Sequence, residues 1–272
     1  MFKTLIQKLL SPFSRNIPRN AEVLGDPETP FVQSSRRSCT FCHHHVDAWQ
    51  PYHLRRSDRS PFLTRLEPVG SNVDRFFCPN CGSTDRERHL YLFFERLKIW
   101  ELFNNAKILH MAPELKLGEL IGNSSPSLYV RGDLFPADAS IEKIDLEHIP
   151  FQNETFDLVI CNHILEHVTA LPAALSEVHR VLMPGGRFIC QTPFASRLTN
   201  TFEDRLLQTE SDRLFFYGQD DHVRLFGLDI EQLLVEAGFI GRLVPHEELL
   251  PEIEPELLGV NEKEPFFDFV RG

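Results

Sequence analysis

Four short apolar runs recur between Lys107 and Pro193, and polar or helix-forming segments separate them. The runs are Ile108–Met111, Leu128–Val130, Phe156–Cys161 and Arg187–Gln191. Such alternation is typical of an α/β fold in which parallel strands are wrapped by helices. Ligands of these sheets bind beyond the carboxyl ends of the strands. The pattern therefore predicts a ligand site built from His110 to Glu114, Asp133, Asp145 and Asn162 to His167.

Apolar residues at helical spacing predict two further elements. Leu90, Phe93, Phe94 and Leu97 predict a helix from Asp85 that leads into the first strand. The stretch LDIEQLLVEAGF reads as an amphipathic helix ending at Gly238. We expect three polar residues of the first helix to be solvated, namely Arg86, Arg88 and His89. The acidic stretch 246–264 reads as a loop or lid, and PFFDFVRG as the last strand.

Three segments resemble a known family: YVRGDLFP, IDLEHIPFQNETFDLVICNHILEHV and HRVLMPGGRFICQTPF. They are similar to the class I S-adenosylmethionine-dependent methyltransferases, in particular to the small-molecule branch. The resemblance implies a Rossmann-like sheet of seven strands, mostly parallel with an antiparallel last strand. It also implies S-adenosylmethionine as cofactor and methyl transfer as the activity.

The resemblance further implies roles for individual residues. Asp133, followed by Leu134, corresponds to the acidic residue that holds the ribose hydroxyls. Asp145 and Leu146 correspond to the pair that flanks the adenine. Asn162 and His163 would lie near the methyl group, and LEHV would begin the helix after the fourth strand.

The turn LHMAPELKLG departs from the glycine-rich first motif of that family. Alanine replaces glycine without strain only where φ stays negative, and proline fixes φ near about −65°. We therefore expect this turn to follow a different path, with cofactor contacts from His110, Ala112 and Glu114. Glu114 either contacts the ammonium group of the cofactor or is a first-turn residue favoured by the helix dipole.

Two polar groups are candidates for catalysis. In NHILEHV, the spacing of His163, Glu166 and His167 places them on one face of the expected helix, and His163 is a candidate general base. An insertion at about 195–227 carries Asp221, His222 and Arg224 among aromatic residues, with His222 as a candidate base and Arg224 as an anion clamp. The alternative is a salt-bridged loop that supports the fold. A metal at Asp221 and His222 lacks a full ligand set.

Two C-x-x-C pairs predict a zinc site with four thiolate ligands, Cys39, Cys42, Cys78 and Cys81. We expect a zinc ribbon over residues 35–84, with a small β-rich insert in 49–75 and solvated histidines at 43–45. The alternative is a redox-active C-x-x-C pair. Cys161 and Cys190 lie in expected strands and read as small core residues.

The chain has 272 residues and a formal net charge of −11, which disfavours non-specific nucleic-acid binding. Five arginines in the ribbon still leave RNA recognition open: Arg55, Arg56, Arg59, Arg65 and Arg75. Residues 1–34 read as a short amphipathic helix and a proline-containing linker, with peripheral membrane contact through residues 2–10 as the weaker alternative. No apolar run is long enough to span a membrane, and we expect a cytoplasmic protein.

These observations predict a zinc ribbon joined to a class I methyltransferase domain over 85–272. The expected function is methyl transfer from S-adenosylmethionine to a small molecule or to a sugar, lipid or peptide precursor. The alternatives are an RNA methyltransferase that recognises RNA through the ribbon, and a non-catalytic cofactor-binding or scaffold protein.

Overall fold

A sheet of seven strands forms the centre of the computed structural model, which describes residues 36–53 and 59–272. In the order β4-β3-β2-β5-β6-β9-β8, only β9 is antiparallel to its neighbours. The predicted sheet is therefore confirmed, and the four apolar runs correspond to β2, β3, β5 and β6. The strands are β2 (Lys107–Met111), β3 (Leu128–Asp133), β4 (Glu142–Lys143), β5 (Phe156–Cys161), β6 (Leu182–Ile189), β8 (Phe239–Val244) and β9 (Phe266–Arg271).

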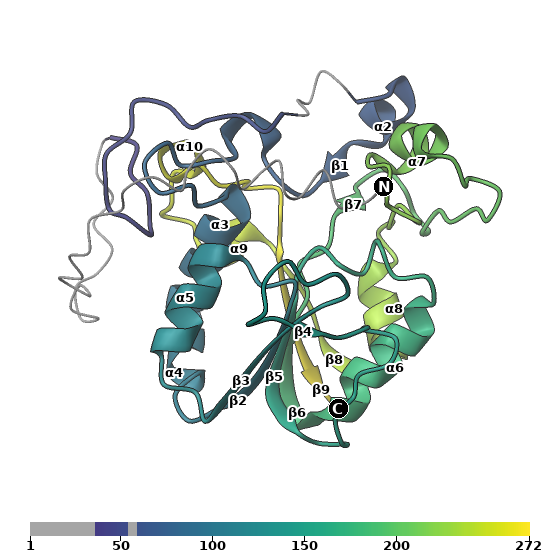
Figure 1. Cartoon of the computed structure of the whole chain (residues 1–272). Helices are drawn as coiled ribbons and strands as arrows, with labels where there is room; N and C mark the ends of the chain where they lie inside the picture. Colours follow the sequence, from purple (N-terminus) through teal and green to yellow (C-terminus); the bar gives the residue numbers. More distant parts are fainter. Residues whose placement is uncertain (1–35, 54–58) are drawn as a thin grey trace. The chain divides into compact units, whose positions relative to one another are not determined.

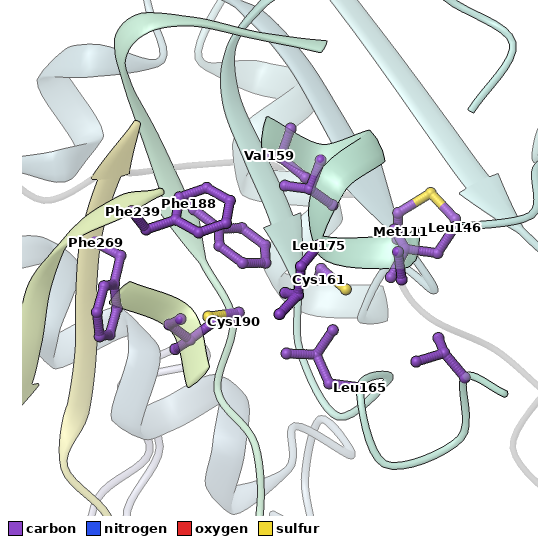
Figure 2. Close-up of a cluster of buried hydrophobic side chains, with 14 of the residues drawn as sticks. Met111, Leu146, Val159, Cys161, Leu165, Leu175, Phe188, Cys190, Phe239 and Phe269 are labelled. Carbon is purple, nitrogen blue, oxygen red and sulfur yellow. The ribbon is translucent and has the colours of Figure 1, made fainter. Parts of the chain in front are cut away.

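Helices cover both faces of this sheet (Figure 1). One face carries α3 (Asp85–Arg96), α4 (Ile99–Leu102) and α5 (Leu115–Asn123), and the other carries α6 (Leu171–Val181) and α8 (Ile230–Glu236). The core against α6 and α8 includes aromatic side chains of the last strands and both remaining cysteines, Cys161 and Cys190 (Figure 2). Both thiols are fully buried, and burial raises their pKa well above the usual value, so the expectation of inert core cysteines is confirmed.

The helix expected from Asp85 begins with a capping box in which Thr84 and Glu87 bond each other's backbone N–H groups. It ends before Lys98, where φ is 54°. The expectation that Arg88 and His89 are solvated is wrong, because both are buried. The guanidinium of Arg88 donates to carbonyls from distant segments, including Ser83, Leu258 and Gly259, and lies 4.1 Å from the ring centre of Trp49.

The insertion forms a small substructure with residues 61–69, which lie before the helix that begins at Asp85. It contains β7 (Phe194–Ala195) and α7 (Glu210–Tyr217), which contact β1 (Pro68–Val69) and α2 (Pro61–Leu66), respectively. Leu63, Tyr217 and Leu225 are buried at its centre. The expected β-rich insert is wrong for the described part of 49–75, which holds α2, a 3-10 turn (Val73–Arg75) and only two strand residues. The domain boundaries at 34 and 84 stay predictions.

The stretch expected to be a loop or lid contains α9 (His246–Leu249) and α10 (Pro255–Leu258). Two hydrogen bonds join it to the cysteine module, the described residues 36–84 around the four clustered cysteines. Ser38 N–H donates to Leu257 O (3.0 Å), and the Trp49 indole donates to Glu256 O (3.1 Å). It is therefore a packed structural segment. Among the described residues, no helix has the length and apolarity to cross a membrane. Residues 1–34, with the helix and linker expected there, and the arginines Arg55 and Arg56 lie outside the described residues.

Candidate functional site

A hydrogen-bonded chain of side chains joins the carboxyl ends of β2 and β5. His110 Nδ1 lies 2.9 Å from the Tyr129 hydroxyl, and its Nε2 lies 2.8 Å from Glu114 Oε2. Glu114 Oε1 accepts from the amide of Asn162 (3.0 Å), and Asn162 Oδ1 accepts from the N–H of Gln191 (3.0 Å). Three predicted cofactor contacts, His110, Glu114 and Asn162, are thus brought together.

Glu114 is the residue at which α5 begins, yet its side chain caps no helix N–H. Burial alone would raise its pKa, but the hydrogen bond and charge of His110 outweigh burial and lower it. The carboxylate is therefore ionised at neutral pH and faces the sheet edge. Of the two interpretations of Glu114, this geometry favours the ligand contact.

The turn after β2 corrects one expectation. Ala112 has φ of 44°, in the left-handed region that glycine adopts without strain, and its N–H donates to Gly132 O (2.7 Å). The expected different path is therefore wrong at this residue: alanine takes the glycine-like conformation at a cost of about 1–2 kcal/mol.

Asp133 and Asp145 each stabilise a local turn with one carboxylate oxygen. Asp133 Oδ1 accepts from the N–H of Phe135 (2.7 Å), and Asp145 Oδ1 accepts from that of Glu147 (2.9 Å). Leu134 and Phe135 are exposed beside Asp133, whereas Leu146 lies in the core (Figure 2). Leu134 and Phe135 therefore supply the exposed apolar surface next to Asp133, at the carboxyl end of β3.

The predicted helix at LEHV is wrong. His163 has φ of 53°, residues 162–167 form turns, and α6 begins only at Leu171. The turns nevertheless place Glu166 Oε1 3.5 Å from His163 Nδ1 and 4.0 Å from His167 Nε2. The three side chains are neighbours, as expected, although a different backbone brings them together.

His163 is buried between two carboxylates. Its Nε2 lies 3.6 Å from Glu264 Oε1, on the side opposite Glu166. Burial lowers the pKa of His163, but the two carboxylates outweigh burial and raise it. Burial would raise the pKa of both carboxylates, but the contact with His163 outweighs it. The pKa of Glu166 is lowered to about 2, and that of Glu264 is lowered as well. The group is a buried imidazole held between two anions.

Sequence reasoning missed Glu264 as a site residue. Because β9 is antiparallel, its first residues lie at the carboxyl edge of the parallel strands, and only Pro265 separates Glu264 from β9. A charged residue next to the apolar last strand is the signal that could have found it. His89, for which solvation was expected over contact with the cleft, also faces this carboxylate, since its Nδ1 lies 3.8 Å from Glu264 Oε2.

The insertion contributes His222 and Asp221 beside His167. The rings of His167 and His222 are 4.7 Å apart, and His167 Nδ1 lies 3.4 Å from Asp221 Oδ2. Burial lowers the pKa of His222 to about 4, which makes it a weak base at neutral pH. Arg224 is buried and donates to Leu165 O and Val168 O, so its geometry fits the supporting interpretation better than the anion clamp.

The four predicted zinc ligands lie together. Cys39 Sγ is 3.7 Å from Cys81 Sγ, Cys42 Sγ is 3.8 Å from Cys78 Sγ, and all four sulfurs lie within 4.8 Å of one another. Tetrahedral zinc with bonds of about 2.3 Å requires sulfurs about 3.8 Å apart, so these residues fit the ion. His43, His44 and His45 are exposed, as expected. The geometry suggests zinc, which stays a proposal.

Comparisons with known proteins agree with this fold. A family model described as "Methyltransferase domain" matches residues 125–190, which contain β3, β4, β5, α6 and β6. The 2-methoxy-6-polyprenyl-1,4-benzoquinol methylase of Homo sapiens mitochondria is 36% identical over 69 residues, 23% of this chain and 21% of that protein. The mitochondrial arginine hydroxylase NDUFAF5 of Mus musculus is 32% identical over 126 residues, 43% of this chain and 36% of that protein.

The matches therefore span about a fifth and about a third of these two curated relatives. A solved structure of 1,6-didemethyltoxoflavin-N1-methyltransferase from Burkholderia thailandensis, with bound S-adenosylhomocysteine, is 14% identical. It covers 66% of this chain and 77% of its own, with a TM-score of 0.43. Residues 125–190 therefore match a methyltransferase domain, and their strands belong to the seven-stranded sheet.

Proposed function

We propose that this protein transfers a methyl group from S-adenosylmethionine to a small molecule or to a sugar, lipid or peptide precursor. The observation that carries the proposal is the chain His110–Glu114–Asn162 at the carboxyl ends of β2 and β5, with Asp133 at the end of β3. These ends are where ligands of parallel sheets bind. When bound, S-adenosylmethionine supplies a methyl group on a positively charged sulfur.

Three features of the chain fit that cofactor. Ala112 keeps the left-handed backbone that permits close approach. Glu114 is anionic and keeps unused lone pairs for an ammonium group, since each oxygen accepts one hydrogen bond. Asp133 is oriented by the N–H of Phe135 through one oxygen, which leaves the other for ribose hydroxyls. Leu134 and Phe135 would offer apolar surface to the adenine.

His163 is the proposed general base. Both ring nitrogens are buried without a hydrogen-bond partner among the described residues, and each faces a carboxylate, Glu166 at 3.5 Å and Glu264 at 3.6 Å, so the base role requires one nitrogen to turn toward the acceptor. If the acceptor is a hydroxyl, its proton would move to His163 while its oxygen bonds to the methyl carbon and the bond from that carbon to sulfur breaks. Glu166 and Glu264 would stabilise the imidazolium. An acceptor that is already deprotonated needs only alignment with the methyl group.

The acceptor class is tested with a methyl-labelled donor. The zinc-loaded protein is incubated with labelled S-adenosylmethionine and, separately, with quinols, sugar, lipid or peptide precursors, and RNA. A quinol is included because the human relative is named for one. Label in a small-molecule or precursor fraction, inhibited by S-adenosylhomocysteine, supports the proposal. Label confined to RNA favours the RNA alternative, and label in no fraction favours a scaffold.

A further inference from the structure

A second group of metal-ligating side chains lies apart from the cysteines. Glu166, His167 and His222 each place one ligand atom within 4.8 Å of the others'. They come from distant segments: the turns after β5 supply Glu166 and His167, and the insertion supplies His222. Sequence alone suggested only Asp221 and His222, which was too small a set. The fold adds Glu166 and His167.

Two of these side chains each bury a potential ligand atom that has no hydrogen-bond partner. Glu166 and His222 are 2% and 5% exposed, and Glu166 Oε2 and His222 Nε2 have no hydrogen-bond partner among the described residues. Leaving a buried polar atom unpaired costs about 1–3 kcal/mol, and more for a charged group. A bound cation would remove this cost by coordinating both atoms.

The neighbours of each histidine orient it as a ligand. His222 Nδ1 lies 3.1 Å from Tyr217 O, and a carbonyl only accepts, so Nδ1 carries the proton and Nε2 presents its lone pair. His167 Nδ1 faces Asp221 Oδ2 at 3.4 Å, which leaves Nε2 on the side of Glu166. Metal-binding histidines usually have such a carbonyl or carboxylate behind the ring.

We propose that Glu166, His167 and His222 bind a divalent transition-metal ion, with Asp221 orienting His167. Two imidazoles and one carboxylate suit zinc, iron, cobalt or manganese. Bonds of about 2.0–2.2 Å require ligand atoms about 3–3.5 Å apart, so small side-chain rotations close the site. Three protein ligands leave coordination positions open.

The open positions would lie beside His163, which is 3.5 Å from Glu166. An oxygen of the methyl acceptor could occupy one of them, and this point rests on the proposed function. Binding of the ion itself does not depend on methyl transfer. The experiment therefore measures metal binding without cofactor or acceptor.

Full-length protein loaded with one equivalent of zinc, which the four thiolates take, is titrated with Co²⁺ and followed by calorimetry and absorption. Cobalt on thiolates absorbs intensely through sulfur-to-metal charge transfer, whereas nitrogen and oxygen ligands give no such band. We expect one Co²⁺ per chain without the thiolate band. Glu166→Gln and His222→Ala should each weaken binding at least about tenfold, and Asp221→Asn about 10–100-fold.

His246→Ala is the matched control, because it removes a buried histidine outside this group. It should leave Co²⁺ affinity unchanged. Retained zinc at the cysteines and an intact melting transition show that each variant is folded. The milder Asp221→Asn keeps the test valid if a core variant does not fold. Absence of Co²⁺ uptake beyond the cysteine site, or equal affinity in wild type and folded His222→Ala, would overturn the proposal.

Discussion

Glu264 Oε1 lies 3.6 Å from His163 Nε2, although the two residues are far apart in the sequence. The contact exists because β9 enters the sheet at the edge where β5 leaves it. Both side chains are buried, so each charge depends on the other. If His163 is the base, Glu264 supports the charge that it acquires.

Glu264→Gln is expected to reduce turnover on a hydroxyl acceptor by roughly tenfold or more, a part of the 10²–10⁴-fold that a positioned base contributes. Affinity for S-adenosylmethionine should stay unchanged, because Glu264 is not among the predicted cofactor contacts. Steady-state kinetics and calorimetry measure the two effects. Glu262→Gln, the same change at an exposed neighbour, is the control. Equal turnover in both variants would remove Glu264 from the mechanism.

Cys78→Ser is expected to release zinc and loosen the cysteine module, because three thiolates and a hydroxyl hold zinc less well than four thiolates. Metal analysis of the purified variant measures the loss. Cys190→Ala, a change at a buried cysteine of the core, should keep the full zinc content. A Cys78→Ser variant with wild-type zinc would refute the four-cysteine site.

Arg88→Met should destabilise the fold by at least about 3 kcal/mol, since it leaves several buried carbonyls unpaired. For a chain of this size, the melting temperature should fall by about 6–12 °C. Thermal unfolding followed by circular dichroism gives the value. The exposed Arg65→Met is the comparison. If both variants lowered the melting temperature by a similar small amount, the hydrogen bonds of Arg88 to Ser83, Leu258 and Gly259 would not hold these segments together.

Stability should fall on acidification through His246. Burial, with His89 nearby, lowers its pKa to about 4. The unfolded chain takes up this proton near pH 6.5 and the native state only near pH 4, so stability is lost as pH falls across that window. The loss is about 1–2 kcal/mol after allowing for solvent screening. Melting curves of wild type and His246→Phe, recorded between pH 4 and about pH 7, test this. The same dependence of melting temperature on pH in both proteins would exclude His246 as the cause.

The central sheet could be predicted because its strands are buried between helices and therefore read as continuous apolar runs. The cluster of four cysteines could be predicted because two-residue spacing is local. The contacts of Arg88, His89 and Glu264 could not be predicted, because most of their partners are distant in the sequence. The helix at His163 was wrong because spacing three and four apart also occurs in consecutive turns. Pro172 then places the start of α6 later.

Titration of zinc-loaded protein with S-adenosylmethionine and S-adenosylhomocysteine tests the central claim most directly. We expect micromolar affinity in the wild type, about −8 kcal/mol. Asp133→Ala should weaken binding at least about tenfold through the lost ribose contact. Asp138→Ala, at an exposed carboxylate that bonds Ser140, should bind as the wild type does. Folded wild-type protein that binds neither ligand would contradict the account and favour a scaffold.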